Sequence, residues 1–151
     1  MKQFEDLYEE VSEFYEGFAV VKHDGKSFHI GLDGAPAYAA RFDCVSRFRQ
    51  GESCASRRGK WFHINTRGEP LYDARFDVLD FFYEGLATAA RNGKCFHITR
   101  DGAPAYPERY EFATFFKDGR AIAVTSKKKP FYIDRAGKRL QKKPDRVQKP
   151  R

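Results

Sequence analysis

The strict spacing of glycine constrains the fold of this chain more than any other feature. Eleven of its 12 glycines fall into three columns whose members lie 34 residues apart, with a single step of 35. The columns are Gly17, Gly51, Gly85 and Gly119; Gly25, Gly59 and Gly93; and Gly34, Gly68, Gly102 and Gly137. Phenylalanine and isoleucine recur with the same period. Self-similarity at a fixed period indicates a tandem-repeat architecture.

The repeats are predicted to be β rather than helical. Two-helix repeats also have a period of about 34 residues, but three glycines and usually one proline per unit would break both helices. The apolar residues between the glycines alternate with a period of two, which is typical of strands. We therefore predict strands after the first glycine column, at residues 18–22, 52–56, 86–90 and 120–124.

The other two columns are predicted to be turns within each unit. Asp24-Gly25 and Asn92-Gly93 are strong two-residue hairpin signals, because both residues can take positive φ. A second strand is expected at residues 27–32, 61–66, 95–100 and 130–135, and a short third strand through 36–38, 70–72 and 104–106. The segment that opens each unit, such as residues 42–48, fits either a short strand or an irregular turn. Small residues on the first strand should face large ones on its neighbour.

These elements predict an all-β fold of four tandem antiparallel β-meander repeats of about 34 residues. An open, curved, solenoid-like array is the first prediction, and a closed, four-bladed, propeller-like ring is the alternative. The expected organisation is a lead-in segment (1–7), a single repeat domain (8–140) and a basic disordered tail (141–151). The units run at about 8–41, 42–75, 76–109 and 110–140.

Charge and cysteine content restrict the classes of function. The net charge is +7, but residues 138–151 alone carry +6, so the repeat region is almost neutral. The first residues are acidic and aromatic, unlike a signal peptide, and no apolar run approaches the length of a membrane span. Three cysteines at unrelated repeat positions do not suggest a disulfide framework. We expect a cytoplasmic protein without membrane contact.

A histidine column is the feature of the repeats that most suggests a metal-binding site. His29, His63 and His97 share one repeat position, and Tyr132 holds it in the last unit. A zinc site would need all three imidazoles within about 2.1 Å of one ion, which equivalent residues of successive units do not reach. We therefore predict no metal, and expect these side chains to pack with their polar tips in water.

An arginine column accompanies the histidines. Arg41, Arg75 and Arg109 each precede an aromatic residue, and an acid follows two positions later, so a repeated surface ion pair is the simplest interpretation. An arginine row that binds an acidic peptide or a phosphate is the sharper hypothesis. The candidate binding residues are His29, His63, His97, Tyr132, Arg41, Arg75, Arg109 and Trp61.

The basic tail suggests a second kind of ligand. Flexible basic segments bind nucleic acid weakly and in a salt-sensitive manner. The candidate residues for a polyanion are Lys138, Arg139, Lys142, Lys143, Arg146, Lys149 and Arg151. No serine lies in a nucleophile-elbow context, and the glycines are spaced for turns rather than for a phosphate loop. We expect neither catalytic residues nor a cofactor.

The repeats resemble the bacterial WG-repeat family, also called KWG repeats. The family pattern F-x-E-G-L-A is matched from Phe82 to Ala87, the pattern G-K-W-G-Y-I-D from Gly59 to Asn65, and a terminal F-D by Phe76-Asp77. The resemblance covers about residues 8–140, and it implies an all-β repeat with a binding or interaction role. The function we predict is therefore a non-enzymatic scaffold that binds a protein or peptide whose identity is unknown, with polyanion binding through the tail as the alternative.

Overall fold

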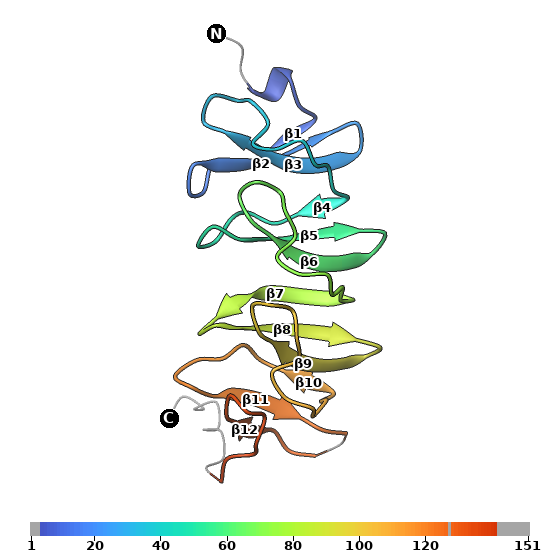
Figure 1. Ribbon diagram of the computed structural model, residues 1–151, viewed down its shortest axis with the longest axis vertical. Coiled ribbons are helices and arrows are strands. Elements are labelled where there is room, and N and C mark those ends of the chain that lie inside the picture. The colour runs from blue at the N-terminus through green and yellow to red at the C-terminus, as the bar shows by residue number, and fades with distance from the viewer. Residues whose placement is uncertain (1–3, 127, 142–151) are drawn as a thin grey trace, which may run out of the picture. The chain divides into compact units, whose positions relative to one another are not determined.

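The computed structural model describes residues 4–126 and 128–141, and strands dominate its regular structure (Figure 1). The chain divides into two compact units, Met1–Asp77 and Val78–Arg151. Apart from Gln141, the predicted tail lies outside the described residues. This includes five of its candidate polyanion residues, Lys142, Lys143, Arg146, Lys149 and Arg151. The described part contains no helix with the length and hydrophobicity of a membrane-spanning segment.

The first unit contains a short 3₁₀ turn, η1 (Phe4–Asp6), and two three-stranded sheets. The first sheet has the order β1-β2-β3 and the second the order β4-β5-β6, and both are antiparallel. The strands are β1 (Glu10–Val11), β2 (Phe18–His23), β3 (Lys26–Gly31), β4 (Cys44–Val45), β5 (Ser53–Arg57) and β6 (Lys60–Ile64).

The second unit repeats this plan with sheets of order β7-β8-β9 and β10-β11-β12. Its strands are β7 (Val78–Tyr83), β8 (Leu86–Arg91), β9 (Lys94–Ile98), β10 (Phe112–Ala113), β11 (Ala121–Val124) and β12 (Phe131–Ile133). Each sheet consists of three consecutive strands, and among the described residues no strand pairing closes the sheets into a ring. The predicted all-β fold of four tandem antiparallel repeats is confirmed. Its solenoid-like curvature stays a prediction.

Tight turns join the strands of each sheet. The predicted hairpin turn in the first sheet is confirmed, with φ of 52° at Asp24 and 76° at Gly25. A second turn of the same kind joins the opening segment to β2, with φ of 53° at Glu16 and 85° at Gly17. Both central residues have positive φ, as in the two-residue turns that match the twist of paired strands.

The predicted third strand of each unit is wrong. Residues 36–38, 70–72 and 104–106 make only single bridges to the neighbouring strand, at Pro36, Pro70 and Pro104. Proline has no backbone N–H to extend such a ladder, and the tyrosine two residues later turns its side chain into the interior. The third strand is instead the opening segment of each repeat, which pairs with the central strand as β1, β4, β7 or β10.

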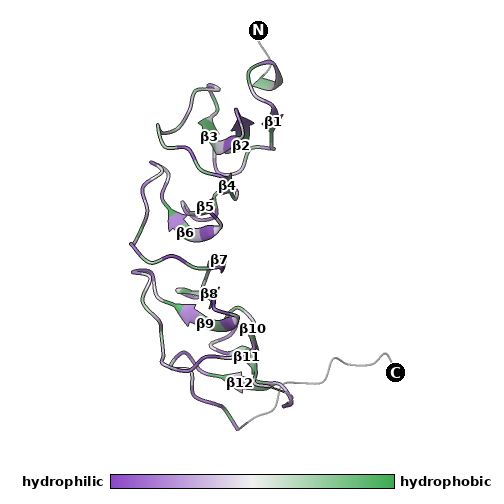
Figure 2. Ribbon diagram, turned by 90° about the vertical axis from the view of Figure 1, so that its right-hand side faces the viewer, coloured by the Kyte–Doolittle hydropathy of each residue, from purple (hydrophilic) through white to green (hydrophobic). Residues whose placement is uncertain are grey.

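Small and large residues face each other across each sheet, as predicted. Ala19 pairs with Ile30, and Val21 pairs with Phe28, with all four side chains almost completely buried. Ala87 and Ala89 pair in the same way with Ile98 and Phe96. Hydrophilic residues are interspersed with these apolar ones, so no sheet is uniformly hydrophobic (Figure 2). In these two sheets, the paired small and large side chains of the central strand and its neighbour are buried together.

Candidate binding surfaces

The histidine column lies inside the protein. His29, His63 and His97 are 0% exposed, so the expectation of a water-facing column on the presented surface is wrong. Each imidazole Nδ1 lies 2.5 Å from the hydroxyl of the tyrosine nine residues later. These partners are Tyr38, Tyr72 and Tyr106. The histidines are buried because a polar partner satisfies them within the same repeat.

The second ring nitrogen joins one sheet to the next. His29 Nε2 donates to the Ser46 carbonyl at 2.8 Å, and the imidazole packs on Phe48 with ring centroids 4.0 Å apart. Because a carbonyl only accepts, Nε2 carries the proton and Nδ1 accepts from the Tyr38 hydroxyl. His97 makes the corresponding contacts with the Thr114 carbonyl at 2.8 Å and with the Phe116 ring.

Burial changes the acid–base properties of these groups. It lowers the pKa of His29 and of His97 to about 4, although hydrogen bonds to the Ser46 and Thr114 carbonyls oppose the shift. It also raises the pKa of their tyrosine partners. The neutral pair is therefore the stable form near pH 7, where it acts as a structural hydrogen-bond relay rather than as a proton donor.

The arginine column has a role that the sequence analysis did not predict. Arg41 Nη1 donates to the carbonyls of Tyr38, Ala39 and Ala40 at 2.9–3.0 Å, and its guanidinium lies 3.6 Å from the centre of the Phe28 ring. Arg75 and Arg109 repeat both contacts in their own loops, over Phe62 and Phe96. The predicted pairing of these arginines with the acid two residues later is wrong, because each guanidinium turns back onto its own loop.

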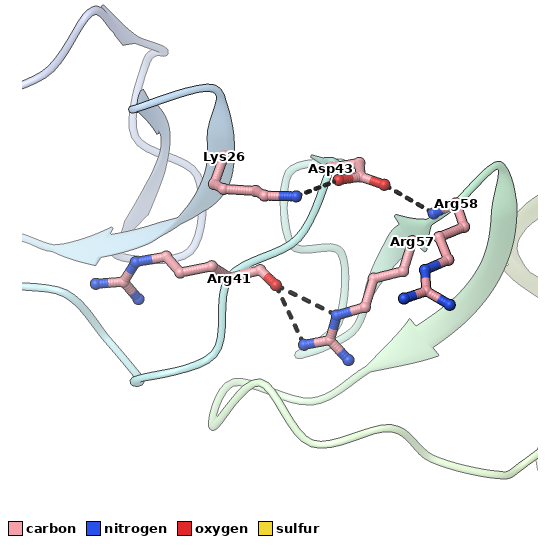
Figure 3. A network of polar contacts seen from close by, with 5 residues as sticks. All are labelled: Lys26, Arg41, Asp43, Arg57 and Arg58. Carbon is pink, nitrogen blue, oxygen red and sulfur yellow. Dashed lines mark hydrogen bonds and ion pairs between the residues drawn. The ribbon is translucent and has the colours of Figure 1, made fainter.

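Lysines at the start of β3, β6 and β9 pair with these acids instead. Lys26 Nζ lies 2.7 Å from Asp43 Oδ1, and Asp43 Oδ2 accepts from the Arg58 backbone N–H at 2.7 Å (Figure 3). The hydrogen bond from Lys26 lowers the pKa of Asp43. Lys60 pairs with Asp77, and Lys94 with Glu111, in the same way. Figure 3 also shows Arg57 donating to the Arg41 carbonyl from the next sheet.

A carboxylate binds the turn of the next sheet in each unit. Glu16 accepts hydrogen bonds from the backbone N–H groups of Gln50 and Gly51 at 2.6 and 2.9 Å. In the second unit, Glu84 binds the N–H groups of Asp118 and Gly119 at 2.6 and 2.8 Å. This contact and the histidine–carbonyl bond together define a recurring interface between successive sheets.

The remaining candidates differ in exposure. Trp61 is half-buried beside its bridge to Phe76. Tyr132, which holds the histidine position of the fourth repeat, is also half-buried, and the Arg120 guanidinium lies 4.1 Å from its ring centre. Of the described residues that could ligate a metal, Glu9, His23 and Asp24 lie within 4.8 Å of one another, but all three are exposed. Tyr132 lines a pocket, and Arg109 lines a second one together with Lys94 and Glu111. The pocket beside Tyr132 is the larger of the two.

That pocket occupies the outer face of the fourth sheet. It has a volume of about 380 Å³ and combines apolar side chains with two basic ones. Its lining is Thr114, Phe115, Lys117, Asp118, Arg120, Ala121, Ile122 and Tyr132. The equivalent faces of the first and third sheets, around His29 and His97, are covered by the opening segment of the following repeat. The pocket therefore lies where the recurring interface would continue.

The family comparison agrees with this repeated geometry. The family model described as "WG containing repeat" matches residues 7–26 and 61–95. These two segments of the chain thus match the WG repeat. The matched parts include Ser12 and Phe14 of the first opening segment, and the whole of β7 and β8. The resemblance suggested by the sequence is thus confirmed.

Several solved structures are similar to this chain at low sequence identity. The computationally designed Ika8 protein matches with a TM-score of 0.51 and 14% identity, over 82% of this chain and 45% of the other. BamB from Moraxella catarrhalis gives 0.49 and 15%, over 86% and 50%. The WD40 β-propeller domain of Doa1 gives 0.48 and 13%, over 86% and 52%.

The chain spans about half the length of each of these structures. Comparison with curated proteins finds no match. At 14% identity, the likeness to the designed Ika8 protein concerns the fold alone.

Two repeated contacts were not predicted, although the sequence contains a regular spacing that indicates each of them. The histidine–tyrosine pairs recur at a constant spacing of nine residues, and the lysine–acid pairs at 17 residues. Both spacings recur in three successive repeats. A constant spacing between two polar columns is a sequence signal for contact, whereas the arginine–loop bonds leave no such signal, because their acceptors are backbone carbonyls.

Proposed function

We propose that this WG-repeat protein is a non-enzymatic module that binds a segment of another polypeptide at the outer face of its fourth sheet. The observation that carries the proposal is the pocket beside Tyr132, at the position where the preceding sheets hold a neighbouring segment. Its volume of about 380 Å³ falls in the range of ligand-binding pockets. The recurring interface supplies a template for the way in which such a face binds an extended chain.

The lining of the pocket indicates the chemistry of the partner. Phe115 and Ile122 offer apolar contact, whereas Lys117 and Arg120 add positive charge at the rim. Arg120 lies over the Tyr132 ring, and an incoming aromatic ring can extend this stack. An extended segment with an aromatic residue next to an acidic one fits these features, and the Tyr132 hydroxyl can donate to its backbone.

Selection from a displayed library of random peptides tests this proposal. We expect the full-length protein to enrich peptides that combine an aromatic with an acidic residue, and the doubly substituted K117E/R120E protein to bind them at least tenfold more weakly. The matched control is K128E/K129E, which changes the net charge equally but alters residues outside this pocket. Peptides that bind all three proteins equally, or no enrichment, would overturn the proposal.

A second candidate function rests on charge segregation. Residues 138–151 carry +6 of the net charge, which favours weak association with nucleic acid or another polyanion. This activity would use a different part of the chain from the pocket, so the two functions are separable by substitution.

A further inference from the structure

We propose that the polypeptide that binds the outer face of the fourth sheet is the first sheet of a second copy of this chain. This inference rests on the proposed function and names its partner. It follows from a comparison between the two sheet-to-sheet interfaces inside the units and the two faces that the first and fourth sheets present to solvent.

The internal interfaces use the same three elements on the incoming side. In the first unit these are the Ser46 carbonyl, the Phe48 ring and the two N–H groups of the Gln50-Gly51 turn. In the second unit they are the Thr114 carbonyl, the Phe116 ring and the turn at Asp118-Gly119. Each opening segment thus brings one acceptor, one aromatic ring and one pair of donors to the sheet before it.

The first sheet carries the same set. Its opening segment places Ser12, Phe14 and the Glu16-Gly17 turn at the corresponding positions. The Ser12 hydroxyl accepts from the Val20 backbone N–H at 2.8 Å, as the hydroxyls of Ser46 and Thr114 accept from their own central strands at 2.9 Å. The turn has the same left-handed backbone as Gln50-Gly51. This segment is therefore already shaped for a preceding sheet.

The fourth sheet carries the receiving set in altered form. Tyr132 replaces the histidine, and its hydroxyl can donate to the Ser12 carbonyl as His29 Nε2 donates to Ser46. Arg120 replaces Phe18, whose ring packs on Phe48 with centroids 4.9 Å apart, and it can stack on Phe14. Asp118 replaces Glu16 as the carboxylate that meets the turn. Each contact of the internal interface thus has a chemical counterpart.

The lead-in segment adds a contact that the fourth repeat lacks. Phe4 packs over Gly34 as Tyr38 packs over Gly68, with ring carbons within 3 Å of where a Cβ would lie. The Leu140 backbone N–H donates to the Tyr132 carbonyl, just as the Ala105 N–H donates to the His97 carbonyl in the third repeat. Leu140 is therefore equivalent to Ala105, and the next residue, Gln141, is equivalent to Tyr106. The fourth repeat therefore lacks the aromatic partner of the buried pair. Phe4 of a second copy can pack against Tyr132 in its place.

Charge favours the same pairing. Residues 4–16 contain six acidic residues and no basic one, whereas residues 117–139 contain eight basic and two acidic residues. Opposite charge on two surfaces accelerates their encounter and selects their orientation. Because the two faces are different, the contact is heterologous and adds copies head to tail.

Two singly defective variants test this geometry. E10K/E13K changes the first sheet, and K117E/R120E changes the fourth; all but Arg120, which is half-buried, are exposed. In sedimentation experiments at low salt, the wild-type protein should increase in average mass with concentration, and each variant alone should remain at 17.5 kDa. An equimolar mixture retains one intact face of each kind and should regain association, at least to a one-to-one dimer.

Several outcomes would overturn the inference. These are a monomeric wild-type protein at millimolar concentration, a mixture that stays monomeric, or a variant that dimerises on its own. The control variant K128E/K129E loses part of the basic charge but no residue of the pocket, so it should still associate, and more strongly than K117E/R120E. The peptide selection judges the proposed function independently: selected peptides that require Lys117 and Arg120 while the intact chain stays monomeric would uphold peptide binding and reject the second copy as partner.

Discussion

The buried histidine–tyrosine pair is the most demanding polar feature of this protein at the scale of single residues. The Tyr38 hydroxyl donates to His29 Nδ1 and accepts from the His29 backbone N–H at 3.1 Å. One oxygen thus satisfies two buried groups of the same residue. Burying such groups without partners costs free energy, so the pair is tolerated because it is complete.

Replacing Tyr38 by phenylalanine should show this dependence. The substitution retains the ring but leaves His29 Nδ1 and its backbone N–H without a partner, which should lower the free energy of unfolding by about 1–3 kcal/mol. Urea denaturation followed by circular dichroism measures the change. Tyr15→Phe is the control, because Tyr15 is 42% exposed, and its loss of a hydroxyl should change stability by less than about 0.5 kcal/mol. Equal effects of both substitutions would contradict the assignment.

The lowered pKa of His29 and His97 predicts a dependence of stability on pH. Below the ordinary pKa of 6.5 the unfolded chain takes up protons, whereas the folded chain does so only near its pKa of about 4. Stability should therefore be complete above pH 6.5 and decrease as the pH falls toward 4. At pH 5 each histidine should cost about 2 kcal/mol.

Urea midpoints at pH 7.5 and pH 5 test this prediction. His97→Gln should lower stability at pH 7.5 but reduce the difference between the two midpoints, because one titrating group is removed. A midpoint that is the same at both pH values would rule out the neutral buried form.

At the scale of structural elements, the glycine columns have two distinct causes. Gly59 has φ of 78° and open space around its Cα, so only the backbone conformation requires glycine there. Gly68 has φ of 72°, and a Cβ there would lie 2.6 Å from two ring carbons of Tyr38. Gly59 is needed for the hairpin turn alone. Gly68 is needed for its turn and also because the Tyr38 ring packs directly on it.

Alanine substitutions should separate these causes. Gly59→Ala should cost about 1–2 kcal/mol, which is the penalty for a left-handed residue with a Cβ. Gly68→Ala adds a clash with a buried ring and should cost about 1–3 kcal/mol more. Chemical denaturation of both variants measures the difference. A Gly68→Ala protein as stable as Gly59→Ala would contradict the packing of Tyr38 on this glycine.

The elements were predictable to the extent that local signals determine them. Asp24-Gly25 identified its hairpin because backbone conformation at a tight turn depends on the two residues themselves. The strand through Pro36 and Tyr38 was wrongly predicted, because an alternating pattern does not reveal that a side chain turns inward to bond a histidine. The opening segment was ambiguous, because β4 has only two residues and its pairing with β5 depends on the tertiary context.

The candidate sites were less predictable than the fold. The repeat pattern singled out His29 and Arg41, but both were predicted to lie on a binding surface. In the structure the imidazole is buried between sheets, and the guanidinium bonds its own loop. Periodicity identifies which positions are equivalent but not which face of a sheet the next repeat covers. Tyr132 was named because it replaces histidine in the last repeat, and in the structure it lines a pocket.

At the scale of the whole molecule, charge is distributed unevenly along the sequence. Acidic residues dominate residues 4–16, and basic residues dominate from Lys117 onward. Association between copies and binding of a polyanion would both use the basic end, and both would weaken in salt. Salt sensitivity alone therefore does not distinguish the two activities. Substitution of basic residues at different positions does.

Binding of a fluorescent single-stranded DNA makes this distinction. If residues 138–151 bind phosphates, the logarithm of the affinity should fall linearly with the logarithm of the salt concentration, with a slope of about −0.7 for each phosphate neutralised. K142E/K143E should reduce both the affinity and this slope, yet leave the heterodimer of the two face variants unchanged. K117E/R120E should have the converse effect on association, while its DNA slope should change less than that of K142E/K143E. DNA binding that K142E/K143E does not affect would exclude the tail as the polyanion site.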